Sequence, residues 1–153
     1  MTRLILFSLN ARGLNSPHKR VGLLDVLERE KVDIAMVSES HLLQRDIYSF
    51  HNRHYHVLSS SSTPNKTKGV LIVARRSLQF TNLGTGGDLE GITFIKTIIA
   101  NRKIAFVSIY APNSFDPNFY TQLTELMFDL VEYLVNFYLQ GVSSLPRWAA
   151  TSH

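Results

Sequence analysis

Residues 3–37 read RLILFSLNARGLNSPHKRVGLLDVLEREKVDIAMV, and this stretch decides the fold class. Arg3–Leu9 is a near-continuous apolar run, which is typical of a strand buried on both faces. Ser16 and Pro17 form a helix start, because serine caps free N–H groups and proline suits the first helical position. The apolar stripe of this helix is Val21, Leu24 and Leu27. Val32–Val37 is a second buried strand, so the order strand, helix, strand predicts a sheet covered by a helix.

The middle of the chain predicts further strands that run in mixed directions. Gly69–Ala74 has the composition of a strong strand, and Tyr55–Leu58 that of a short one. Ile92–Ala100 and Ile104–Tyr110 flank a polar Asn-Arg-Lys segment, which predicts an antiparallel hairpin. The glycine-rich segment 83–88 is expected to be a flexible connection.

One long helix is the last regular element that the sequence predicts. Asp116 and Pro117 repeat the combination of a cap and a first-turn proline, and Gly141 is the expected stop. The apolar stripe consists of Phe119, Leu123, Leu126, Met127, Leu130, Leu134, Phe137 and Tyr138. No further strand is expected after Tyr110. We therefore expect an α/β domain, or part of one, over residues 1–140, and an unstructured or atypical tail at 141–153.

The composition bounds the class of protein. With 153 residues, of which 44% are hydrophobic, the chain is long enough for one domain with a sizeable core. The net charge of +4 is compatible with nucleic acid as a partner, and also with an ordinary soluble domain. The absence of cysteine excludes disulfides, zinc–thiolate sites and cysteine nucleophiles. No secretory leader or membrane span is recognisable, so an intracellular protein, nuclear or cytoplasmic, is expected, with no membrane partner.

Three predicted strands deliver a polar residue at or near their C-terminal ends. These residues are Asn10, Glu39 and Tyr110. A carboxylate there can hold a hard cation such as Mg²⁺, an amide can ligate or orient, and a phenol can hydrogen-bond a phosphate. Taken singly, each is more often a solvated loop residue, a turn residue or a half-buried sheet residue. Their joint placement predicts a metal-assisted hydrolytic site, although such a site needs more acids and a general base.

Basic residues along the chain are candidates for phosphate contacts. They are Lys19, Arg20, Lys66, Lys68, Arg75 and Arg76. Solvated surface charge is the more common role of such residues, and the sequence leaves both interpretations open.

Three blocks of sequence carry a resemblance to a known family. They are FSLNARGLNSPHKRVGLLDVLEREKVDIAMVSESHL at 7–42, KGVLIVARR at 68–76 and FVSIYAPN at 106–113. In order and spacing they resemble the N-terminal half of the endonuclease/exonuclease/phosphatase superfamily. Within it, they are most similar to the apurinic-type endonuclease domain of LINE-type (non-LTR) retrotransposons. The resemblance implies a partial four-layered α/β sandwich with mixed sheets, in which the C-terminal half is absent.

The resemblance also implies a chemistry and the residues that perform it. The implied activity is Mg²⁺-dependent phosphodiester hydrolysis, here the nicking of DNA at a retrotransposon target site. By this resemblance Glu39 is the metal-binding glutamate, and Asn10 is the first-strand asparagine, also beside the metal. Tyr110 matches the active-site tyrosine, and Asn113 matches an asparagine near the substrate.

The chain also departs from the family pattern. Ser38 stands where the family has a glutamine, and no aspartate follows Asp129. The family's Gly-Asp-x-Asn block, expected soon after the helix that begins at Pro117, is replaced by YLQGVSSLPRW, and its Ser-Asp-His block is absent as well. Because a base histidine and its orienting acid are missing, we predict that the chain is inactive alone. Three alternatives stay open: a non-catalytic nucleic-acid-binding or interaction remnant, a remnant that yields no stable fold, and a phosphoinositide phosphatase-like activity.

Overall fold

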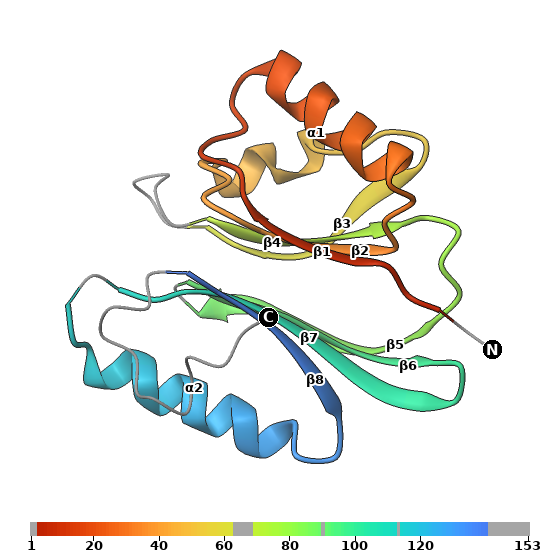
Figure 1. Cartoon of the computed structure of the whole chain (residues 1–153). Coiled ribbons are helices and arrows are strands. Elements are labelled where there is room, and N and C mark those ends of the chain that lie inside the picture. Colours follow the sequence, from red (N-terminus) through yellow and green to blue (C-terminus); the bar gives the residue numbers. More distant parts are fainter. Residues whose placement is uncertain (1–2, 63–68, 90, 113, 141–153) are drawn as a thin grey trace.

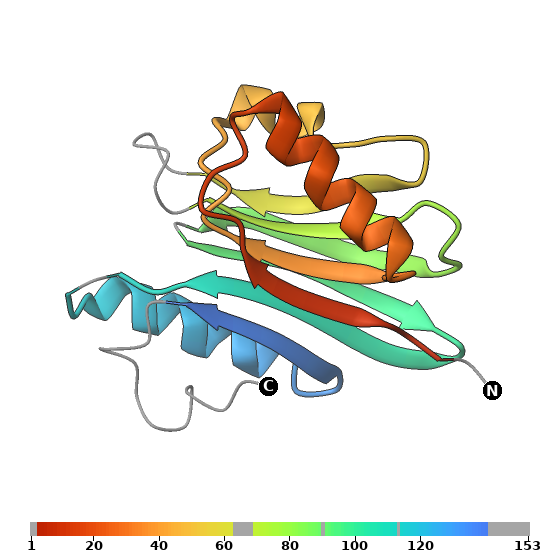
Figure 2. The same cartoon turned by 45° about the horizontal axis from the view of Figure 1, so that its top comes forward.

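The fold consists of two sheets packed face to face, with a helix on the outer side of each sheet (Figure 1 and Figure 2). The strands are β1 (Leu6–Asn10), β2 (Ile34–Ser38), β3 (Tyr55–Ser61), β4 (Val70–Arg75), β5 (Thr81–Leu89), β6 (Ile92–Ile99), β7 (Arg102–Tyr110) and β8 (Leu134–Gln140). The helices are α1 (Pro17–Arg29), α2 (Pro117–Asp129) and the short 3-10 helix η1 (Gln44–Ser49). The expected partial four-layered α/β sandwich is therefore confirmed.

This computed structural model describes residues 3–62, 69–89, 91–112 and 114–140. The tail expected at 141–153, Asn113, Lys66 and Lys68 lie outside the described residues. No helix within the described part of the chain is long and apolar enough to cross a bilayer.

The first sheet has the strand order β1-β2-β4-β3. β1 and β2 are parallel, while β4 is antiparallel to both of its neighbours. Every residue of β2 is buried, because one face of the strand meets α1 and the other meets the second sheet. On the helix side, Ala35 and Val37 belong to one core cluster with Leu24 and Leu27. Val21 was expected in this stripe but is 59% exposed, so the buried face of α1 is narrower than predicted.

The second sheet has the strand order β5-β6-β7-β8 and contains the expected hairpin. β6 and β7 pair antiparallel from Ile92 opposite Ile109 to Ile99 opposite Arg102. Ala100 and Asn101 connect them, and both have positive φ, as required by a two-residue turn whose twist matches that of the strands. The turn is therefore tighter than predicted, because β7 begins within the polar segment rather than after it.

The segment 83–88 is not a flexible connection but part of strand β5, which pairs antiparallel with β6. Its glycines serve close packing. A side-chain carbon on Gly87 would lie 1.7 Å from the carbonyl oxygen of Ser60 in β3, and one on Gly86 would collide with the ring of Phe94. Glycine composition predicted freedom of the backbone here, whereas the packing of β5 against β3 and β6 requires the absence of side chains.

The expectation of a single helix up to Gly141, with no further strand, is wrong. α2 ends at Asp129, and Leu134–Gln140 forms β8, which pairs parallel with β7. The connection from β7 through α2 to β8 is a parallel crossover, in which a helix packs back on the sheet. Periodicity misled because a short apolar run fits a helix and a strand equally well. Tertiary pairing with β7 decides between them.

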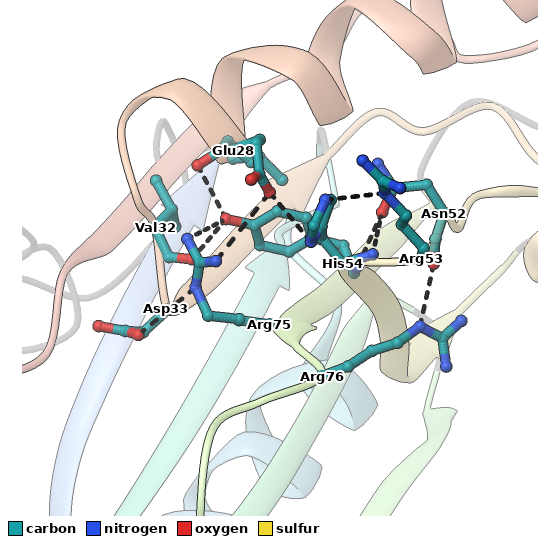
Figure 3. Close-up of polar contacts among 10 residues, drawn as sticks. Glu28, Val32, Asp33, Asn52, Arg53, His54, Arg75 and Arg76 are labelled. Atoms are coloured by element: carbon teal, nitrogen blue, oxygen red, sulfur yellow. Dashed lines mark hydrogen bonds and ion pairs between the residues drawn. The ribbon is translucent and has the colours of Figure 1, made fainter.

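A polar cluster closes the end of the first sheet that lies opposite the predicted site (Figure 3). Arg75 Nη1 lies 4.0 Å from Glu28 Oε2, and Arg75 Nε lies 3.9 Å from Asp33 Oδ1. Glu28 Oε2 also lies 3.5 Å from His54 Nδ1. The guanidinium of Arg75 stands over the ring of Tyr55, at 5.3 Å from its centroid. Arg75 thus ties α1 to the sheet and is remote from any phosphate bound at the predicted site.

Candidate active site

Four strands bring polar side chains to one edge of the sandwich. Asn10 ends β1, Tyr110 ends β7 and Gln140 ends β8, while Glu39 directly follows β2. In the two parallel pairs, Asn10 lies opposite Ser38 and Tyr110 lies opposite Gln140. We call Asn10, Glu39, Tyr110 and Gln140 the rim. The sequence prediction named three of these residues and missed the fourth.

The backbone around Glu39 is held in an unusual conformation. Glu39 and His41 both have positive φ, at 52° and 56°, which is uncommon for residues with side chains. Gly13 N donates to the carbonyl oxygen of Glu39 at 2.7 Å, and Leu14 N donates to that of Ser40 at 2.7 Å. These contacts bind the loop after β1 to the loop after β2. Strained residues that surrounding contacts hold in place are characteristic of functional sites.

Neighbouring residues orient the carboxylate of Glu39. Asn10 Nδ2 donates to Glu39 Oε2, and the backbone N–H of Arg12 donates to Asn10 Oδ1 at 2.9 Å. The amide orientation of Asn10 follows, because the carboxylate accepts only and the backbone N–H donates only. His41 Nε2 lies 3.7 Å from Glu39 Oε1, and the Glu39 side chain is 24% exposed. The carboxylate is therefore oriented and still accessible.

Two of the basic candidates hold the loop that carries Asn10 in place. Lys19 Nζ donates to the carbonyl oxygens of Ala11 at 2.8 Å and Arg12 at 2.9 Å. Arg20 Nη1 donates to those of Leu14 at 2.8 Å and Asn15 at 2.9 Å. These cations donate to backbone carbonyl oxygens, although Lys19 is also exposed to solvent. The structure thus gives them a local role that charge alone did not reveal.

The negative charge of Glu39 acts on two tyrosines of the second sheet, Tyr110 and Tyr138. Burial, followed by the negative charge of Glu39, raises the pKa of the Tyr110 phenol above its ordinary value. Burial is also the main cause that raises the pKa of Tyr138, with Glu39 adding to it. Hydrogen bonds from Ser38 and Gln140 act in the opposite direction on Tyr138. Both phenols therefore keep their protons at neutral pH and remain hydrogen-bond donors.

Tyr138 and Gln140 were missed because Leu134–Gln140 was assigned to a helix. A signal for them was present, since Gln140 ends an apolar strand run just as Asn10 and Tyr110 do. The pattern of a polar residue at the C-terminal end of an apolar run, which indicated Asn10, Glu39 and Tyr110, therefore also indicates Gln140.

The rim has the donor chemistry that a hard divalent cation requires. Mg²⁺ takes oxygen ligands, keeps several waters and is commonly held by one or two carboxylates together with substrate phosphates. Glu39 supplies one accessible carboxylate, whereas the amide oxygen of Asn10 accepts from Arg12 N and the phenol of Tyr110 keeps its proton. Within the described residues, no group of three or more histidine, aspartate or glutamate side chains gathers as a metal site. The residues fit a cation whose remaining ligands are water and phosphate.

The architecture is similar to that of several proteins of known structure. No family model matches the sequence. The endonuclease domain of TRAS1, a telomere-specific non-LTR retrotransposon, superimposes with a TM-score of 0.66 at 15% identity, over 90% of this chain and 58% of that chain. An endonuclease/exonuclease/phosphatase family protein from Bacteroides thetaiotaomicron gives a TM-score of 0.67 at 12% identity, over 94% of this chain and 66% of that one. The chain has the endonuclease/exonuclease/phosphatase fold.

Other proteins with the endonuclease/exonuclease/phosphatase fold match as well. TDP2 from D. rerio, complexed with a single-strand DNA product, gives a TM-score of 0.61 at 14% identity, over 89% of this chain and 59% of that chain. The chain thus spans 58% to 66% of the length of the three structures. The resemblance inferred from the sequence blocks is confirmed at the level of the fold.

Proposed function

We propose that this chain supplies part of a site for metal-assisted hydrolysis of a phosphodiester, with DNA as the substrate. The observation that supports this most is the Glu39 carboxylate, oriented by Asn10 at the neighbouring strand end. The similarity to a retrotransposon endonuclease domain favours a nuclease, and the DNA complex of a second similar protein favours nucleic acid. The described rim has the groups for binding a metal and a phosphate.

Three of the rim residues have proposed roles that follow from their contacts. Glu39 holds the cation, and Asn10 fixes the carboxylate through its amide nitrogen, leaving its oxygen on Arg12. Tyr110, whose phenol stays protonated, donates a hydrogen bond to a phosphate oxygen. By resemblance alone, Asn113 contacts the substrate. When bound, Mg²⁺ would neutralise the negative charge that develops on the phosphate oxygens.

The chain as given is proposed to bind without cleaving. The Gly-Asp-x-Asn and Ser-Asp-His blocks, which supply the acids and the base in the family that the sequence resembles, do not occur in its 153 residues. A water molecule that attacks phosphorus needs a group to accept its proton. We therefore assign to this chain the cation-binding part of the site and not the complete reaction.

Replacement of Glu39 by alanine is expected to weaken cation binding at least 10-fold, because the rim loses its carboxylate. The measurement is a titration with Mn²⁺, followed by electron paramagnetic resonance, since Mn²⁺ favours the same oxygen ligands as Mg²⁺. Glu125→Ala removes an equal charge from an exposed position on α2 and is the matched control. Equal affinities of Glu39→Ala and the unchanged chain for Mn²⁺ would contradict the proposed metal site.

In a plasmid assay with Mg²⁺, the chain is expected to leave supercoiled DNA intact, because the sequence lacks the blocks that supply the general base in the family pattern. Relaxation of the plasmid that disappears in Glu39→Ala would show that the chain cleaves and that the prediction of inactivity is wrong. DNA binding that is sensitive to salt but indifferent to Mg²⁺ and to Glu39→Ala would favour the non-catalytic binding module.

A further inference from the structure

The fourth member of the rim carries an inference about the cation site. β8 runs parallel to β7 and ends at Gln140, whose carbonyl oxygen accepts from Ala111 N at 2.9 Å. Gln140 lies opposite Tyr110 in the register of the pair. The backbone of Gln140 is therefore fixed at the same edge of the sandwich as the proposed metal ligand, on a regular strand rather than on a loop.

The side chain of Gln140 is fixed as well. Its Nε2 donates to the hydroxyl oxygen of Tyr138 at 2.8 Å, and Tyr138 is only 8% exposed. The same hydroxyl oxygen accepts from Ser38 Oγ at 3.4 Å, and Ser38 is fully buried. This chain of contacts crosses from β8 to β2 and ends one residue before Glu39. It couples the position of the glutamine amide to the loop that carries the carboxylate.

The chemistry of an amide determines what this arrangement presents. A glutamine side chain is planar, with two N–H donors on one side and a carbonyl acceptor on the other. With Nε2 turned to Tyr138, the carbonyl oxygen Oε1 is turned away from it. Gln140 is partly exposed, whereas Tyr138 below it is buried, so the amide is the more accessible group of the two. A neutral oxygen of this kind is a ligand that hard cations accept.

We propose that Gln140 is a further residue of the divalent-cation site, to which it supplies its amide oxygen, and that Tyr138 is the residue that positions it. The proposal rests on the proposed function, because the cation is the one assigned to Glu39. It makes the site one of a single carboxylate and a neutral oxygen. Such a site binds a hard cation more weakly than a pair of carboxylates does, and an added negative charge strengthens it.

The test adds a negative charge, or removes the amide, at the position of Gln140 in the full chain. Gln140→Glu is expected to tighten Mn²⁺ binding about 10-fold, since a carboxylate replaces a neutral ligand. The Tyr138 hydroxyl, which accepts from Gln140 Nε2, would then donate its own proton to the carboxylate. Gln140→Leu is expected to weaken binding several-fold. Gln79→Glu adds the same charge at an exposed position that follows β4 at the other end of the sheet, and it should change the affinity little.

Tyr138→Phe separates positioning from folding. Tyr138→Phe is expected to bind Mn²⁺ more weakly than the unchanged chain does, without losing binding altogether. The thermal midpoint of unfolding measures any structural damage separately. In two-dimensional NMR spectra, Mn²⁺ should broaden the side-chain NH₂ signals of Gln140 and leave those of Gln79 sharp. A merely structural role for Tyr138 would lower the thermal midpoint and leave affinity and broadening unchanged.

The outcomes distinguish this inference from the proposed function. If Glu39→Ala abolishes Mn²⁺ binding while both Gln140 variants match the parent chain, the inference about Gln140 fails and the site at Glu39 remains. If the parent chain binds no Mn²⁺, or Glu39→Ala binds it equally well, the proposed metal site fails and the role of Gln140 fails with it.

Discussion

Replacement of Tyr55 by alanine is expected to lower the free energy of unfolding by about 3–5 kcal/mol, the usual cost of deleting a large aromatic side chain from a core. Tyr55 is fully buried and belongs to the core between α1 and the first sheet. Its hydroxyl lies 2.8 Å from the carbonyl oxygen of Leu27 and 2.7 Å from that of Val32. Because these carbonyls lie at the end of α1 and just before β2, Tyr55 anchors the helix to the sheet.

Tyr55→Phe is the matched control, since it keeps the ring and removes only the hydroxyl. The expected loss is about 1–3 kcal/mol, because the carbonyl oxygens of Leu27 and Val32 and Arg75 Nη2, 3.0 Å from the hydroxyl oxygen, each lose one hydrogen-bond contact. Urea unfolding monitored by circular dichroism measures both variants, and an unchanged m-value would show that the unfolded state is unaffected. A loss below about 1 kcal/mol for the alanine variant would mean that α1 does not depend on this anchor.

The sequence predicted the elements whose signals are local. Both long helices begin at the expected prolines, Pro17 and Pro117. The Asp116 side chain accepts from Asn118 N at 3.0 Å and Phe119 N at 3.4 Å, which is the predicted cap. Ser16 adopts the extended conformation of a cap residue but makes no side-chain cap hydrogen bond. Proline and the apolar stripe were therefore sufficient to start α1.

The errors concern elements that exist because of distant partners. β8 is a strand because β7 offers a parallel edge, and no feature of Leu134–Gln140 alone excludes a helix. β5 is a strand because it pairs with β6, and its glycines are needed because Ser60 in β3 leaves no room for a side chain at Gly87. Both strands depend on contacts with residues tens of positions away, and local propensity does not include such contacts.

The candidate site was predictable in outline and not in detail. Strand ends that follow buried runs are visible in the sequence, and parallel pairing brings them to one edge. The contact between Asn10 and Glu39 joins residues 29 positions apart, and it depends on the positive φ of Glu39. Backbone strain of this kind leaves no mark in the residue types around it. It is set by the hydrogen bonds between the two loops.

Replacement of Gly91 by alanine is expected to lower the free energy of unfolding by about 2–4 kcal/mol. The loss has two causes, because alanine is strained in the left-handed conformation of Gly91 and its side-chain carbon collides with a neighbouring backbone atom. Gly91 has a φ of +81°, and an added side-chain carbon would lie 2.5 Å from the carbonyl oxygen of Tyr110. Backbone atoms cannot rotate away as the end of a flexible side chain can. Tyr110 N also donates to the carbonyl oxygen of Gly91 at 2.8 Å, so relief of the collision breaks the last pairing at the rim.

Gly22→Ala is the control that separates this collision from a general response to alanine. Gly22 lies within α1, and an added side-chain carbon would meet nothing within 4 Å. That substitution should stabilise the chain by about 0.5–1 kcal/mol, because alanine restricts the unfolded chain and favours a helix. Urea unfolding should thus give opposite signs for two identical substitutions. Changes of the same sign and size would contradict the close approach of Gly91 to Tyr110. If the two changes in the free energy of unfolding have opposite signs, altered NMR chemical shifts of Tyr110 in Gly91→Ala would show that the turn before β6 sets the position of a rim residue.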